Sequence, residues 1–249
     1  MKLLETKEIT KQFDNKKIIE DINIHIDSGE IVSLLGVSGV GKTTLFNIIA
    51  GVITPDEGAV LLNGSNINGN SGQISYMLQK DLLLAHMNIC DNVALPLFVK
   101  GVKKNEAKRR AKELLPLFGL DGVEKKYPSQ LSGGMRQRAA FLRTYLFSDE
   151  VALLDEPFSA LDAITKQDMH KWYMNIMKEI KLSTIFITHD IDEAIMLSDR
   201  IYIMAGSPGK IVKEIKINQE KYDREDFNLT VEFLQYKKEV MSYLKNEKA

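Results

Sequence analysis

The stretch Leu34-Leu35-Gly36-Val37-Ser38-Gly39-Val40-Gly41-Lys42-Thr43-Thr44 decides the fold of this chain. It fits the pattern G-x-x-x-x-G-K-[ST], in which a glycine-rich turn wraps around phosphate groups. The apolar run at 31–35 predicts a buried strand before the turn, and Leu45, Ile48 and Ile49 predict a helix with one apolar stripe after it. The pattern therefore stands in the strand–loop–helix context that makes it a phosphate-binding loop.

Each residue type in this loop has a physical task. Gly36, Gly39 and Gly41 permit backbone angles and close approaches that a side chain would forbid. Successive N–H groups in front of a helix N-terminus attract anions. Lys42 brings a positive charge to the terminal phosphates, and the Thr43 hydroxyl is a hard oxygen ligand for Mg²⁺. The alternative, a glycine-rich turn that its lysine merely caps, does not explain the strand and helix around it.

The composition describes a globular chain of ordinary make-up. Its 249 residues suit one large domain or a domain with a subdomain, and 44% are apolar and 27% charged. The formal net charge of −1 gives no overall basic field for nucleic acid, and a local basic patch is the alternative. The one cysteine, Cys90, excludes an internal disulfide, fits a reducing compartment and is expected to be a small buried residue.

No membrane-directed segment is predicted. Residues 1–10 lack the continuous apolar core of a signal peptide. No apolar run approaches the about 18 residues of a membrane span. We therefore expect any role at a membrane to be served from the cytoplasmic side, through a partner.

Short strands are expected at the start of the chain. Ile22, Ile24 and Ile26 alternate with polar residues, which predicts a half-buried strand with His25 on its exposed face. Taken alone, Phe13 is most simply a core aromatic residue. Later apolar runs predict strands at 59–62, 74–78, 151–154, 184–188 and 201–204. A stretch rich in Asn, Gly and Ser predicts a loop at 63–72, and helices are expected at 191–197 and 231–244.

Helical periodicity between residues 81 and 148 predicts a helical subdomain inserted after Gln79. Seven Lys and Arg residues at 100–112 most simply cover the solvated face of a helix, and contact with an anionic partner is the alternative. The Ser-Gly-Gly turn at 132–134 predicts a helix start whose free N–H groups form a second anion site. Alone, that turn would be an ordinary helix start.

Polar side chains follow the predicted buried strands. Asp155 and Glu156 end one strand, and two adjacent acids repel each other and are costly to bury without partners. Mg²⁺ would explain the first, and a water to be oriented or deprotonated would explain the second. His189 ends the next strand, where its simpler interpretation is a polar residue before a helix capped by Asp190. Parallel strands place ligands beyond their carboxyl ends, so these ends and Gln79 could converge on one nucleotide.

Taken together, these motifs resemble the ATP-binding subunit of an ABC transporter, up to about residue 217. The discriminating stretch is Leu131-Ser132-Gly133-Gly134-Met135, which is similar to the ABC signature. The other motifs agree in order and spacing: Gln79 as Q-loop, Leu153-Leu154-Asp155-Glu156 as Walker B, Ser159-Ala160-Leu161-Asp162 as D-loop and His189 as switch histidine.

The resemblance implies an α/β fold. Its core would be a P-loop NTPase with a mostly parallel sheet, an N-terminal antiparallel β subdomain and an inserted α-helical subdomain at about 81–148. An ABC ATP-binding domain would span 1–217 and a helical tail 218–249.

The resemblance also implies ATP and Mg²⁺ as cofactors. Phe13 would stack on adenine, where many relatives have Tyr. The metal would be held by Thr43, Gln79 and Asp155, the last through water. Catalysis would use Glu156 on the attacking water, His189 on the γ-phosphate, and Gln79 to couple the site to the helical subdomain. The implied nucleotide-binding residues are Phe13, Gly36, Val37, Ser38, Gly39, Val40, Gly41, Lys42, Thr43, Thr44, Ser132, Gly133, Gly134 and Asp162.

Partners follow from the same resemblance. Residues 132–134 would bind the γ-phosphate of ATP held by a second copy, so hydrolysis would need a head-to-tail dimer that closes on ATP. Closure would drive integral-membrane permease subunits from the cytoplasmic face of the cell membrane. An extracytoplasmic substrate-binding protein would act indirectly, and nucleic acid would have no role.

Three stretches point to a subtype. Residues 76–84, 91–96 and 207–211 look like importers of the nitrate, sulfonate and taurine type, which includes carriers of thiamine precursors. Ala85 stands where these relatives often have Pro, in the region expected to touch the membrane subunit. Met135 replaces the more common Gln, outside the Ser-Gly-Gly part.

Three other functions are the alternatives. A soluble ABC-type ATPase of DNA repair or translation usually carries long coiled coils or two cassettes. A P-loop small-molecule kinase would need an acceptor pocket, and would need neither 131–135 nor the acids at 155–156. A purely regulatory module would be favoured only if Glu156 or His189 were missing.

Overall fold

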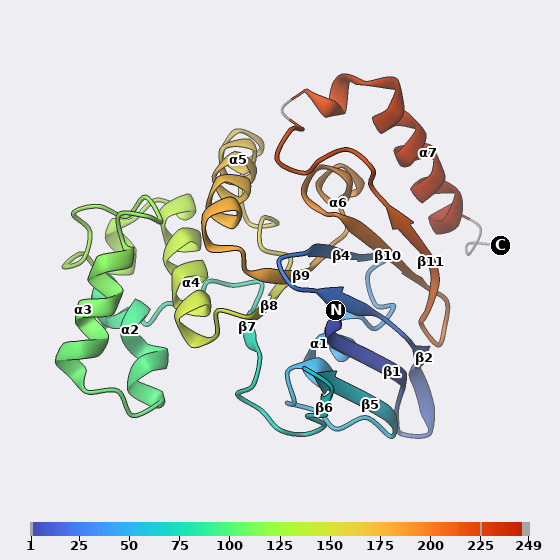
Figure 1. Cartoon of the computed structure of the whole chain (residues 1–249), viewed down its shortest axis with the longest axis horizontal. Helices are drawn as coiled ribbons and strands as arrows, with labels where there is room; N and C mark the ends of the chain where they lie inside the picture. Colours follow the sequence, from blue (N-terminus) through green and yellow to red (C-terminus); the bar gives the residue numbers. More distant parts are fainter. Residues whose placement is uncertain (1, 225, 246–249) are drawn as a thin grey trace.

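The computed structural model describes residues 2–224 and 226–245 and confirms the α/β fold (Figure 1). At its centre, within the described residues, is a six-stranded sheet in the order β11-β10-β4-β9-β8-β7. The strands from β10 to β7 are mutually parallel, and β11 pairs antiparallel with β10. The strands are β4 Ile31–Gly36, β7 Ser75–Met77, β8 Val151–Asp155, β9 Ser183–Thr188, β10 Arg200–Ala205 and β11 Lys210–Lys216.

The central strands are buried on both faces, as their unbroken apolar runs predicted. Every residue of β4, β8, β9 and β10 is buried. Leu153 and Ile185 pack on the side of α1 (Lys42–Ile49), whereas Leu154 and Phe186 pack on the side of α5 (Ala163–Ile180). Burial on both faces fixes the position of the strand ends, where Gln79, Asp155 and His189 lie.

An antiparallel sheet covers one side of this core, and it is the expected N-terminal β subdomain. Its strands are β1 Lys2–Phe13, β2 Lys16–Ile22, β3 His25–Asp27, β5 Glu57–Leu62 and β6 Ser65–Asn66. In Figure 1 it lies at the lower right, beside α1. The strand expected at 59–62 is confirmed, and β6 adds a two-residue strand inside the expected loop at 63–72.

Two expectations for the N-terminal region are wrong. The single strand expected around Ile22–Ile26 is divided at residues 23–24, where the N–H group of Ile24 donates to the Thr6 hydroxyl at 3.0 Å and not to a backbone carbonyl. His25 does not lie on an open polar face. It is half-buried, and its Nδ1 lies 3.1 Å from the hydroxyl of Tyr202.

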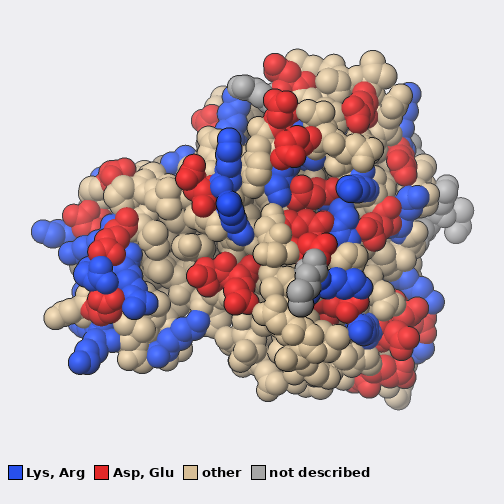
Figure 2. All heavy atoms as spheres, viewed as in Figure 1, with Lys and Arg blue, Asp and Glu red and all other residues tan. Residues whose placement is uncertain are grey.

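The stretch between β7 and β8 is helical, as predicted. It contains α2 Ile89–Val99, α3 Lys104–Leu114, the short 3-10 helix η1 Pro128–Gln130 and α4 Gly133–Phe147, which lie at the left of Figure 1. Cys90 is buried, as expected. Of the cations around α3, Lys108 pairs with Asp91, and Arg109 and Arg110 pair with Glu106. Charged side chains of both signs gather in this region of Figure 2. This mixture favours a solvated helix face.

The chain ends in structure that the sequence only partly predicted. The helices expected at 191–197 and 231–244 are present as α6 Ile191–Leu197 and α7 Val231–Lys245, with the short η2 Phe227–Leu229 before α7. Phe233 and Val240 of α7 are buried against α6 and β10. Strand β11 was not predicted. Strand β11 belongs to the central sheet and ends at Lys216. The boundary between an ATP-binding domain and a helical tail at residue 217 stays a prediction.

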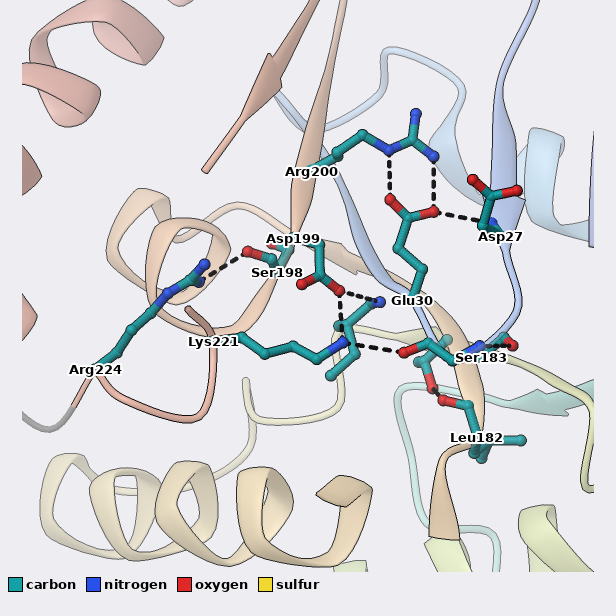
Figure 3. Close-up of polar contacts among 12 residues, drawn as sticks. Asp27, Glu30, Leu182, Ser183, Ser198, Asp199, Arg200, Lys221 and Arg224 are labelled. Atoms are coloured by element: carbon teal, nitrogen blue, oxygen red, sulfur yellow. Dashed lines mark hydrogen bonds and ion pairs between the residues drawn. The ribbon is translucent and has the colours of Figure 1, made fainter. Parts of the chain in front are cut away.

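A polar cluster connects the residues after β11 to the starts of the central strands, at the end of the sheet opposite the phosphate loop (Figure 3). The Lys221 ammonium donates to Asp199 at 2.7 Å and to the Gly29 carbonyl at 3.0 Å. The Arg224 guanidinium donates to the Ser198 carbonyl at 2.8 Å. Nearby, Arg200 pairs with Glu30 through two of its nitrogens. The C-terminal segment is therefore anchored to the strand starts of the core.

Candidate nucleotide-binding and active site

The phosphate loop joins β4 to α1, and its geometry requires glycine at two positions. Gly41 precedes α1 with a φ of 108°, and a Cβ there would lie 2.4 Å from the Ile19 side chain. A Cβ on Gly36 would lie 2.3 Å from the Met204 carbonyl oxygen. Both contacts are too short for any side chain. The loop therefore sits closely against β2 and β10, with its N–H groups in front of the helix.

Lys42 lies inside this loop and is only 7% exposed. Its ammonium donates to the carbonyls of Gly36 at 2.8 Å and Val37 at 2.9 Å. Burial lowers the pKa of Lys42, while the nearby carboxylates of Glu156 and Asp155 act in the opposite direction. The positive charge is thus held at the centre of the loop, where a phosphate anion would meet it.

Asp155 ends β8 beside the loop. Its Oδ2 accepts hydrogen bonds from the Thr43 hydroxyl at 3.3 Å and from the Tyr76 hydroxyl at 3.4 Å. Burial raises the pKa of Asp155, and the neighbouring Glu156 raises it further, although the hydrogen bonds oppose the shift. A buried carboxylate beside a hydroxyl is a pair of hard oxygen donors, so these residues fit Mg²⁺.

Tyr76 is a contact of this site that the sequence analysis did not single out. Its ring packs edge-on against Phe46 of α1, with ring centroids 6.0 Å apart, and its hydroxyl faces Asp155. Burial raises the pKa of Tyr76 well above its ordinary value, so the hydroxyl stays protonated and donates a hydrogen bond to Asp155. Its position three residues before Gln79 on a strand was the available signal.

Glu156 lies between two other strand ends. Gln79 Nε2 donates to Glu156 Oε2 at 3.1 Å and to the Ser159 hydroxyl at 3.2 Å. His189 Nδ1 lies 3.2 Å from Glu156 Oε1. The structure therefore brings together the ends of β7, β8 and β9, as parallel pairing predicted. Each oxygen of the carboxylate has its own partner.

Phe13 ends β1 and is 44% exposed, with the Lys11 ammonium 5.3 Å from its ring centroid. The simple interpretation as a core aromatic is wrong for this residue. A pocket of about 250 Å³ lies beside the phosphate loop, and Gly206 and Ser207 form part of its wall, which the sequence analysis did not anticipate. The lining residues are Lys16, Lys17, Ile18, Val37, Ser38, Gly39, Val40, Gly206 and Ser207.

The helix start predicted at 132–134 is confirmed, whereas its role as a second anion site stays a prediction. The Ser132 hydroxyl caps α4 by accepting from the Met135 N–H at 3.3 Å. Gly134 packs on α5, where a Cβ would lie 3.5 Å from the Thr165 side chain. Among the described residues, no hydrogen bond or ion pair joins 132–134 to the phosphate loop of the same chain.

The last predicted site residue, Asp162, caps α5. Its Oδ1 accepts from the N–H groups of Ile164 at 3.2 Å and Thr165 at 3.1 Å. Its carboxylate is exposed and forms no recorded contact with the phosphate loop among the described residues. Its role toward a nucleotide therefore stays a prediction.

Comparison with known proteins identifies the family. The sequence model described as ABC transporter matches residues 19–159, more than half of the chain. The chain belongs to the ABC transporter family. It is 39% identical to an uncharacterized ABC transporter ATP-binding protein of Methanocaldococcus jannaschii, over 98% of this chain and 92% of that protein.

Two similar proteins have names that describe them as import ATP-binding proteins. The formylaminopyrimidine import ATP-binding protein ThiZ of Halalkalibacterium halodurans is 42% identical, over 86% of this chain and 84% of the relative. The aliphatic sulfonates import ATP-binding protein SsuB of Bacillus cereus is 41% identical, over 88% and 86%. Both support the subtype that three stretches of the sequence indicated.

Solved structures agree on the architecture of this ABC subunit. A dimeric ATP-binding cassette in a post-hydrolysis state, bound to ADP and Pi, superposes with a TM-score of 0.71 at 28% identity, over 87% of this chain and 100% of that one. The family therefore supports ATP binding and ATP hydrolysis by this chain. No helix within residues 2–224 and 226–245 is long and apolar enough to cross a membrane.

Proposed function

We propose that this chain is the ATP-hydrolysing subunit of an importer, and that two copies close on ATP to drive a separate permease for a small solute. The observation that carries the proposal is the position of Glu156. It touches Gln79 and His189 and directly follows Asp155, which faces Thr43. Two neighbouring acids with different partners can have different tasks.

The residues present fit ATP and Mg²⁺. The backbone N–H groups of 36–44 and the ammonium of Lys42 would hold the phosphates, and Phe13 would stack on adenine. The oxygens of Thr43, Gln79 and Asp155 would hold the metal. Bound Mg²⁺ would supply charge neutralisation at the phosphates.

The chain's own residues provide the rest of the chemistry. Glu156 orients the attacking water and accepts its proton. Gln79 and His189 hold the carboxylate from two sides, at 3.1 Å and 3.2 Å. The His189 side chain is 64% exposed, so its ring is accessible to a terminal phosphate. Phosphoryl transfer depends mainly on positioning and charge stabilisation, which this arrangement offers.

A second copy is needed in this proposal because, in the part of the chain that the structure describes, no hydrogen bond or ion pair joins Ser132 or Gly133 to the phosphate loop of their own chain. They stand at the start of α4, beside Leu161 of the D-loop segment. A head-to-tail pair would place the α4 start of one copy over the phosphate loop of the other. The dimeric state of the related cassette bound to ADP and Pi supports this arrangement.

Coupling to a permease would run through the segment after Gln79. Arg136 of α4 pairs with Asp81 at 3.3 Å, and Arg143 donates to the Leu82 carbonyl at 2.8 Å. A movement of Gln79 would therefore displace α4 through these contacts. In this proposal the helical region lies against the permease at the cytoplasmic face. The import names of the relatives support an ATP-binding subunit of an importer. In this proposal the subunit is peripheral, and an extracytoplasmic substrate-binding protein acts indirectly.

The test is release of phosphate from Mg-ATP with no acceptor added. Glu156→Gln should lower turnover by a factor of about 10² or more, since the base is lost while the shape is kept. Glu179→Gln, on the exposed surface of α5, is the matched control and should retain activity. Unchanged turnover in Glu156→Gln would refute the assignment. Turnover only with an added small-molecule acceptor would favour a kinase.

A further inference from the structure

A cluster of charged side chains around the buried Glu193 contacts both chain neighbours of His189. Glu193 of α6 is only 4% exposed, and three groups reach its carboxylate. The Lys166 ammonium lies 2.5 Å from Oε1, His170 Nε2 lies 3.4 Å from the same oxygen, and the Thr188 hydroxyl donates to Oε2 at 2.5 Å. The cluster therefore joins α5, β9 and α6 around one carboxylate.

The same lysine also holds the other side of His189. Its ammonium donates to Asp190 Oδ2 at 2.7 Å. Asp190 in turn caps α6 through the N–H groups of Asp192 at 2.9 Å and Glu193 at 3.2 Å. The Asp190 N–H group donates to the Thr188 hydroxyl at 3.0 Å. Both neighbours of His189 in the chain are thus connected to Lys166, one directly and one through Glu193.

His189 needs this support because its own side chain is mostly exposed. Little packing orients the ring, so the backbone at 188–190 must set where the imidazole meets Glu156. An exposed ring on a loosely held turn would sample many positions, and small displacements at a reacting centre reduce rates steeply. The fixed turn supplies the missing constraint.

The charges of the cluster are mutually stabilising. Burial alone would raise the pKa of Glu193, but the neighbouring His170, Lys166 and Thr188 bring it below the ordinary value. Burial alone would lower the pKa of Lys166, but its bonds to Asp190 and Glu193 bring it above the ordinary value. The lysine is therefore protonated and both carboxylates are ionised at neutral pH.

Lys166 also stands one helical turn from the D-loop. Its N–H group donates to the Asp162 carbonyl at 2.8 Å, in the first turn of α5. In the proposed dimer the D-loop segment meets the second copy. A movement of the α5 start on closure would therefore reach the His189 turn through the lysine.

We propose that Lys166 is a positioning residue for His189, acting through Asp190 and Glu193, and that it links the D-loop to the catalytic turn. The inference rests on the proposed role of His189 in hydrolysis. It adds a residue that lies outside the phosphate loop and outside every motif from which the family resemblance was built.

The experiment compares Lys166→Met with Lys237→Met in the full chain. Lys237 of α7 pairs with Asp192 on the outer side of α6 at 2.7 Å, so its replacement also removes one ion pair from α6. We expect Lys166→Met to lower kcat by about tenfold or more, with KM for ATP changed by less than about twofold. Lys166→Arg should restore most of kcat, because it keeps the charge.

A spectroscopic readout separates positioning from general damage. The chain has four histidines, and the imidazole signal of His189 can be assigned by comparison with His189→Gln. That signal should shift in Lys166→Met and stay in place in Lys237→Met. It also tests the positioning if wild-type turnover is absent, which would instead overturn the proposed hydrolysis.

Three results would overturn the inference. The first is a kcat of Lys166→Met equal to that of Lys237→Met. The second is a loss confined to KM, and the third is an unmoved His189 signal. If Lys166→Met does not fold, the double variant Lys166→Met/Glu193→Gln removes the unpaired buried carboxylate. It should fold and still lose kcat, whereas wild-type kcat in the double variant would also overturn the proposal.

Discussion

The Nδ1 atom of His189 lies 3.2 Å from the Oε1 atom of Glu156, so the ends of β9 and β8 meet at one carboxylate. The end of β7 supplies Gln79, which holds the other oxygen. Sites built on strand ends are held more rigidly than sites on long loops.

The first prediction concerns Gly209, which supports the phosphate loop from outside. A Cβ there would lie 2.1 Å from the Val40 carbonyl oxygen. The backbone cannot withdraw easily, because Gly209 N–H donates to the Ile18 carbonyl at 2.8 Å. Gly209→Ala should therefore displace the loop and weaken Mg-ATP binding by about tenfold, measured by titration calorimetry.

Gly64→Ala is the control for this prediction. Gly64 has a φ of 78°, so the substitution strains the backbone, but a Cβ there meets nothing within 4 Å. It should reduce thermal stability without changing the affinity for Mg-ATP. A wild-type affinity in Gly209→Ala would show that the 206–209 loop does not support the phosphate loop.

The second prediction concerns Arg224, which anchors the C-terminal segment and is 4% exposed. It donates to the carbonyls of Ile195 and Ser198, each at 2.8 Å, at the end of α6. Burial lowers its pKa to about 10, which still leaves it charged at neutral pH. Arg224→Met would leave these carbonyls without a donor and should cost about 2–4 kcal/mol.

Thermal denaturation measures that cost. A loss of this size in a chain of this length corresponds to a Tm lower by roughly 5–15 °C. Arg109→Met removes exposed ion pairs with Glu106 and Glu113 on α3, and its Tm should match the wild type within error. Equal Tm values for the Arg224 and Arg109 variants would mean that the C-terminal segment does not stabilise α6.

The third prediction concerns the pH dependence of stability. The folded-state pKa of Glu193 lies below its ordinary value of about 4.3. As the pH falls through that value, the unfolded chain takes up the proton first, and the stabilisation by Glu193 is lost toward the lower folded-state pKa. Glu193→Gln should be less stable at neutral pH and lose less stability on acidification.

Urea midpoints between about pH 7 and pH 3 test this linkage. The wild type and the surface variant Glu179→Gln should lose stability with the same slope at the acid end. Glu193→Gln should show a flatter slope there. A slope identical to the wild type would contradict the ionised state assigned to the cluster around Lys166.

Much of the fold was predictable, because its strongest signals are local. The buried strands at 151–154, 184–188 and 201–204 are unbroken apolar runs, and they lie where the structure has β8, β9 and β10. The helix start at Ser132 and the cap at Asp190 were predicted from residue type and position, and the Asp190 side chain accepts the Asp192 N–H group. Parallel pairing then predicted which strand ends meet.

The parts that were missed depend on partners distant in sequence. Strand β11 lies at the edge of the sheet, and its residues Ile211-Val212 and Lys213-Glu214 break the apolar–polar alternation of a half-buried strand, so only its pairing with β10 specifies it. The division of the strand near Ile24 depends on the hydroxyl of Thr6. Likewise, the contact of Lys166 with Glu193 depends on where the fold brings α5 and α6, which spacing within either helix does not reveal.

The central claim is that two copies share the nucleotide site. The most direct test is the molar mass of Glu156→Gln in solution, by light scattering, with and without Mg-ATP. Blocked hydrolysis should convert a monomer into a dimer on addition of ATP. Ser132→Arg in the same background should abolish pairing, whereas Ser242→Arg on α7 should not. A Glu156→Gln chain that binds ATP tightly and remains monomeric would contradict the account.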